Sequence, residues 1–194
     1  MFARVRFFKI TGYDAKGAPT LDTTAIKLYT PGEGEPEVNN RSISLEPDSS
    51  SVPLEADNRK VNNEVVKGAN ITLSAYGVDE TALSALTEFT KDTDGINRTV
   101  NTDSKKHFVL VFNGKKTNGA EYTCYLADTT IKNVLPSSEQ DGDSATERSI
   151  TGYASAIVIN GKSTLGRMAF KGEQGFLAQN VEPDATTVQA LLAK

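Results

Sequence analysis

The sequence predicts a mainly β protein of the α+β class, with an antiparallel sandwich or barrel-like sheet, one flanking α-helix and a long extended loop. Several segments alternate apolar and polar residues, and turn signals such as Asn-Gly separate them. Helical spacing of apolar residues occurs at only two places. The 194 residues suit one domain, 1–194, whose core is large enough to fold without disulfides.

The chain begins with two predicted strands. Residues 3–10 alternate as in a half-buried strand, with Val5 and Phe7 on one face and Arg6 and Phe8 on the other. Residues 24–30 alternate in the same way, and the Gly- and Pro-bearing stretch 12–20 predicts the turn between the two strands. These segments should form an early strand pair.

Residues 31–60 have a different composition. They contain four of the seven prolines, many Ser, Asp and Glu residues, and only short apolar patches. So little apolar surface cannot fold by itself. We therefore expect a long extended loop, either a surface loop or a segment that becomes ordered against a partner.

A strand and a helix should follow directly. Residues 60–77 resume the alternation, and Asp79 or Thr81 can cap a helix that starts near Glu80. The apolar residues of this helix recur at helical spacing, so they should pack it on the sheet. These helix-packing residues are Leu83, Leu86 and Phe89.

Two hairpins and a terminal helix complete the prediction. Residues 106–134 contain Asn-Gly at 113/114 and 118/119, and residues 149–172 contain it at 160/161. The nearly apolar-free stretch 136–149 should be a flexible polar loop. Asp184 can cap a short helix that carries Val188, Leu191 and Leu192.

Composition excludes several kinds of site. The only cysteine, Cys124, cannot form an internal disulfide, and with the only histidine, His107, it cannot supply a zinc site. We expect His107 to be an ordinary strand-end residue and Cys124 a buried one, with no catalytic, cofactor-binding or metal site. No apolar run reaches membrane-span or signal-peptide length, and a net charge of −4 without a basic block argues against duplex binding.

The order of these segments resembles that of the major tail tube proteins of long-tailed bacteriophages with non-contractile tails. The resemblance covers about residues 45 to 180, and its most specific stretches are VPLEADNRKV and NITLSAYGVD. It implies a structural virion protein, not an enzyme, made in the host bacterial cytoplasm. Such a protein assembles with itself as stacked hexameric rings and meets tail terminator, tape measure and distal tail proteins.

The resemblance also implies roles for particular residues. Strands of neighbouring subunits would close one barrel around a lumen through which genomic DNA passes without specific binding. We expect acidic and small polar side chains to line that lumen, since phosphate contacts would stall transit. The loop 31–60 would cross a subunit or ring boundary, with interface residues Val52, Leu54, Asp57, Arg59 and Lys60.

Two other functions remain open at this point. A tube subunit of a related bacterial secretion or phage-like apparatus would share the fold and much of the composition. A carbohydrate-binding or adhesin β-sandwich would need an exposed aromatic platform, but the chain has no Trp and its tyrosines mostly alternate within strands.

Overall fold

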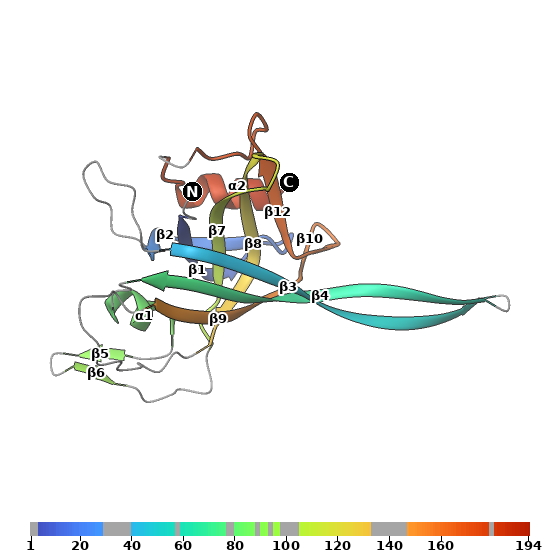
Figure 1. The fold of residues 1–194 in the computed structure, drawn as a ribbon, viewed down its shortest axis with the longest axis horizontal. Helices are drawn as coiled ribbons and strands as arrows, with labels where there is room; N and C mark the ends of the chain where they lie inside the picture. The colour runs from blue at the N-terminus through green and yellow to red at the C-terminus, as the bar shows by residue number, and fades with distance from the viewer. Residues whose placement is uncertain are drawn as a thin grey trace.

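A computed structural model describes residues 4–28, 40–56, 59–76, 80–87, 90–92, 95–97, 105–132, 147–178 and 181–194. Antiparallel sheet dominates it, which confirms the mainly β prediction (Figure 1). The main sheet runs in the order β2-β1-β7-β8-β9-β4-β3, and β12 also pairs with β8. Its strands are β1 (Val5–Tyr13), β2 (Pro19–Lys27), β3 (Asn40–Ala56), β4 (Arg59–Tyr76), β7 (Phe108–Lys115), β8 (Glu121–Ile131), β9 (Glu147–Ser155) and β12 (Gly166–Phe170).

Smaller elements surround this sheet. The short strands β10 (Ile157–Ile159) and β11 (Lys162–Thr164) form one hairpin, and β5 (Thr90–Asp92) and β6 (Gly95–Asn97) form another. The two described helices are α1 (Glu80–Leu86) and α2 (Ala185–Leu192). Figure 1 shows α2 across β7 and β8 at the top of the view, and α1 at the lower left, beside the end of β4.

Strands β1, β7 and β8 have a hydrophobic core on each face. The inner core joins Phe7, Leu110 and Leu126 to Ile71 of β4 and Ile150 of β9, so the sheet curls around it. On the opposite face an outer core packs against α2; it contains Phe8, Val109, Val111, Tyr125, Val188, Leu191 and Leu192.

The expectation that β1 is half-buried was therefore wrong. Arg6 and Phe8, which the alternation placed on the solvent side of this strand, are both fully buried. The reason is the C-terminal segment, which lies far away in the sequence and covers the face that alternation alone assigned to solvent.

The expected loop at 31–60 is also corrected, because residues 40–56 are strand β3 and residues 59–60 begin β4. Residues 31–39 and 57–58 lie outside the described residues. The two strands pair from Asn40↔Ala75 to Ala56↔Arg59. This ladder satisfies backbone hydrogen bonds whatever the side chains are, so a Ser-, Pro- and Glu-rich segment becomes extended despite its composition.

The helices lie where the sequence placed them. In α1, Leu83 and Leu86 are 4% and 1% exposed and belong to the inner core. The helix ends at Leu86, and Phe89 lies outside the described residues. The predicted cap of α2 is confirmed: Asp184 Oδ1 accepts a 2.7 Å hydrogen bond from the Thr187 backbone N–H.

Two of the three Asn-Gly signals form turns. Asn160 and Gly161 both have positive φ, 52° and 75°, as the two-residue turn between β10 and β11 requires. Gly119 likewise turns the chain between β7 and β8 with φ 85°. Asn113-Gly114 instead lies within β7, where the Tyr122 ring fills the space of a Cβ at Gly114. Of the predicted polar loop, residues 147–149 belong to β9 and residues 136–146 lie outside the described part.

Candidate assembly surface

The outward face of β3, β4 and β9 is lined by small polar and acidic residues. The strand register aligns them in rows, for example Ser44↔Thr72↔Thr151 and Glu46↔Asn70↔Tyr153. Alternate residues of the same strands, such as Ile71 and Ile150, point into the inner core. This polar face comprises Ser42, Ser44, Glu46, Asp48, Asn70, Thr72, Ser74, Ser149, Thr151 and Tyr153, none of them buried.

The polar face has an acidic rather than a basic character. Among its described residues there are two carboxylates, Glu46 and Asp48, and no Lys or Arg. Tyr153 lies across Gly68, and its hydroxyl donates a 2.8 Å hydrogen bond to Asp48 Oδ2. That hydrogen bond, to a carboxylate, raises the pKa of Tyr153. The face offers nothing that would neutralise a phosphate, so it has no electrostatic attraction for DNA.

Beyond the body of the sheet, β3 and β4 continue as a two-stranded arm, defined here as residues 49–56 and 59–66. Strand β9 pairs with β4 only from Gly68 to Tyr76, so along the arm each strand has only the other as its described ladder partner. Figure 1 shows the arm reaching far from the rest of the molecule. A register shift separates Asp48↔Gly68 from Ser49↔Val66 and marks its start.

Such an arm is a poor structure by itself. An isolated two-stranded hairpin is at best marginally stable in water. The register pairs Leu54 with Val61 and Ser50 with Val65 along the arm. Among the described residues, the arm therefore lacks the third strand or the packing that would make such a ribbon stable by itself.

Four of the five predicted interface residues belong to the arm. Val52 and Leu54 are in β3, whereas Arg59 and Lys60 begin β4, opposite Ala56 and Glu55. Asp57 lies outside the described residues. The structure thus brings four of the five predicted positions to the arm, and their role in an interface stays a prediction.

Sequence reasoning missed a buried polar network beneath the C-terminal segment. The fully buried Arg6 donates from Nη1 to Asn113 Oδ1 at 3.0 Å and from Nε to Glu182 Oε2 at 3.2 Å. Asn113 Nδ2 donates to the Leu177 carbonyl at 2.8 Å and to Thr123 Oγ1 at 3.1 Å. The network fastens residues 177–182 to the sheet. The only sequence signal was an arginine between the apolar residues Val5 and Phe7.

His107 and Cys124, the two residues considered as catalytic or metal-binding candidates, have different surroundings. His107 Nδ1 lies 2.7 Å from Asp128 Oδ1, a pairing that sequence spacing did not reveal. Burial raises the pKa of the Cys124 thiol to about 12, so the thiolate needed for reactivity does not form near neutral pH. Within the described ranges, His, Cys, Asp and Glu form no cluster of three or more able to hold a metal ion.

Comparison with known proteins adds no identification, since neither a family model nor a curated protein matches the chain. Among the described residues, no helix has the length and apolar character needed to span a membrane.

Proposed function

We propose that this protein is a structural subunit that polymerises into the tail tube of a long-tailed phage. The observation that carries the proposal is the arm of β3 and β4, an extended hairpin whose strands have no other described ladder partner. A monomer gains little from such an arm. In a polymer the arm would link neighbouring subunits, because burial against another copy would supply the packing that the arm lacks.

The polar face suits the inside of the tube. A conduit must let DNA slide, and each neutralised phosphate would add a favourable, salt-dependent contact that slows it. The rows of Ser, Thr and Asn, such as Ser44, Thr72 and Thr151, provide hydration without a positive charge. We therefore assign this face to the lumen.

The sheet edges suit ring closure. At opposite ends of the main sheet, β2 and β3 each have one described strand neighbour, and β3 is 17 residues long. A long open edge invites pairing with another chain. In a closed hexameric ring neighbouring copies cover these edges, as strands do in any closed barrel.

The remaining parts of the proposal follow from this role. The subunit acts in the virion tail after synthesis in the host bacterial cytoplasm, and its activity is assembly rather than catalysis. Its partners are further copies of itself and the tail terminator, tape measure and distal tail proteins at the tube ends. Genomic DNA is its cargo.

Negative-stain electron microscopy at rising protein concentration, with size-exclusion chromatography beside it, tests the proposal. We expect rings or uniform hollow tubes. A chain that stays monomeric at all concentrations, even with preformed tube ends added as seeds, would contradict it.

A shortened arm gives the matched variant. Ser50 and Val65 are cross-strand partners, so residues 51–64 can be replaced by Asn-Gly to close a tight turn there. This variant should keep the circular dichroism spectrum of the body and lose assembly. Unimpaired tubes from it would exclude the arm as the link between subunits.

A further inference from the structure

The surface formed by β10, β11 and β12 is basic and exposes apolar side chains. Residues 156–172 contain Lys162, Arg167 and Lys171 and no acidic residue; Lys171 is paired with Glu121 of β8 at 3.1 Å, so Lys162 and Arg167 carry the basic character. Val158 is 62% exposed and Met168 47% exposed. A cavity of about 290 Å³ adjoins β11 and β12 and is lined in part by Lys162, Arg167, Leu191 and Lys194.

Strand β12 also has an open edge. Leu165 accepts from the Ala127 N–H and Lys171 donates to Glu121, so alternation turns the backbone groups of Arg167 and Ala169 toward β8. Those of Gly166 and Met168 turn the other way, where the described residues supply no strand. An added strand would find both a hydrogen-bonding edge and an apolar contact there.

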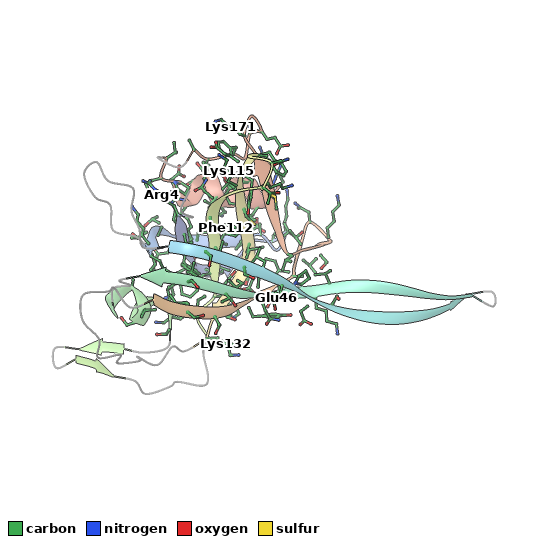
Figure 2. All side chains as sticks on the ribbon, in the orientation of Figure 1. Arg4, Glu46, Phe112, Lys115, Lys132 and Lys171 are labelled. Atoms are coloured by element: carbon green, nitrogen blue, oxygen red, sulfur yellow. The ribbon has the colours of Figure 1, made fainter. Side chains whose placement is uncertain are left out.

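Strand β3 has the complementary chemistry. Residues 42–56 carry three acidic residues, Glu46, Asp48 and Glu55, and no Lys or Arg. Glu46 is exposed where β3 leaves the body of the protein, as labelled in Figure 2. Leu45, 36% exposed, adds an apolar side chain at the same place. One edge of β3 is occupied by β4 along its whole length, which leaves its other edge for a new partner.

Two prolines restrict where that edge can pair. Proline lacks an N–H, and in a sheet it is tolerated where its nitrogen faces an open edge. Pro47 and Pro53 are six positions apart on β3, so strand alternation directs both nitrogens to the same edge, and we take this to be the edge away from β4 because a proline nitrogen cannot donate to the β3–β4 ladder. The stretch between them, 48–52, matches the five residues of β12 in length.

We propose that β12 receives the edge of β3, centred on residues 48–52, from a second copy of this chain, with Glu46 and Asp48 near Lys162 and Arg167. This inference rests on the proposed self-assembly and names the two surfaces that meet. The docked strand supplies partners to Gly166 and Met168 and covers the Met168 side chain. We choose β3 rather than the other open edge, β2, because the acidic residues of β3 complement the basic residues on and beside β12.

Disulfide trapping tests the contact in the full-length chain. The native Cys124 is buried and protonated, so engineered cysteines are the reactive ones. A tagged Met168→Cys chain is mixed with untagged Ser49→Cys, and separately with Thr23→Cys on the exposed edge strand β2 as the control. We expect a disulfide-linked dimer with Ser49→Cys only. Equal linkage to Thr23→Cys, or none to either, overturns the proposal.

Charge reversal gives a second readout. Lys162→Glu and Glu46→Lys should each raise the concentration needed for assembly by about tenfold, from loss of attraction plus added repulsion. Mixing the two variants should restore assembly, because each reversed surface then meets a complementary one. Lys9→Glu, at an exposed position of β1, is the matched control and should leave assembly unchanged.

The outcomes separate the two proposals. Cross-linked copies without rings or tubes would uphold the docking and refute the tube. Wild-type tubes that neither cross-link nor respond to Lys162→Glu would uphold the tube and refute this docking.

Discussion

Asn113→Ala should destabilise the isolated subunit far more than an ordinary polar-to-alanine change does. Asn113 is 6% exposed and accepts from Arg6, whose side chain is fully buried and charged. It also donates to Thr123 and to the Leu177 carbonyl. Alanine removes all three hydrogen bonds while leaving the guanidinium inside the protein.

The magnitude follows from what each partner retains. Thr123 keeps hydrogen bonds with the Leu177 backbone N–H and carbonyl, so its loss is small. Arg6 keeps Glu182 and the Val181 carbonyl but loses its 3.0 Å acceptor. A lost hydrogen bond to a buried charged group costs about 1.5 to 3 kcal/mol. With the cavity left by the amide, the free energy of unfolding should fall by about 2 to 4 kcal/mol.

Urea denaturation followed by circular dichroism measures this change, with Asn70→Ala as the matched control. Asn70 is an exposed strand residue of the same type, and its replacement should stay within about 0.5 kcal/mol of wild type. Limited proteolysis should also release the segment after residue 177 earlier from Asn113→Ala. If the two variants have the same midpoint and slope, the polar network does not fasten the C-terminal segment.

Three further predictions concern pH, a glycine at the base of the arm, and the lumen. Burial raises the pKa of Tyr125 from 10.0 to about 12, so the stability contributed by its neutral phenol is complete below pH 10 and is lost as the pH rises toward 12. In denaturation series across that range Tyr125→Phe should lose less stability than wild type, and parallel curves would contradict this. A Cβ at Gly68 would lie 2.4 Å from the Ala154 carbonyl oxygen, so Gly68→Ala should cost about 1 to 3 kcal/mol in thermal unfolding, unlike Ser74→Ala. Finally, tubes of the double variant Ser42→Lys/Asn70→Lys should retain duplex DNA with an affinity that falls about 0.9 log units per log unit of salt for each phosphate contact, whereas wild-type tubes, or tubes with Ala190→Lys at an exposed position of α2, should not; equal retention by these three kinds of tube would remove the polar face from the lumen.

Local signals were sufficient where the structure depends on neighbouring residues. Asp184 caps α2 because its side chain reaches Thr187 in the next turn, and Asn160-Gly161 turns because both residues adopt positive φ. The same kind of signal failed at Asn113-Gly114. There β7 continues because its backbone pairs with β1 and β8, and a packed Tyr122 ring explains the glycine.

Contacts between residues far apart in the sequence determine the features that local sequence patterns did not predict. The partner of Arg6, Glu182, is 176 residues away, so nothing near Arg6 indicates that the face is buried. Composition misled the reading of β3 because Ser, Pro and Glu disfavour a core, and β3 needs none along the arm. The sequence did single out Val52 and Leu54, and the structure places both in β3, but their role as interface residues stays a prediction.

The composition of β3 makes sense if one strand must meet two opposed requirements. As an open edge it must not pair indiscriminately before assembly, and Pro47 and Pro53 remove donors while Glu46 and Asp48 add repulsion between identical edges. As the proposed link between subunits it must still pair with one chosen surface. A basic edge such as β12 resolves the conflict, because the charges that keep two β3 edges apart attract β3 to Lys162 and Arg167. The residues that made this segment look like an irregular loop are therefore those that would make its assembly selective.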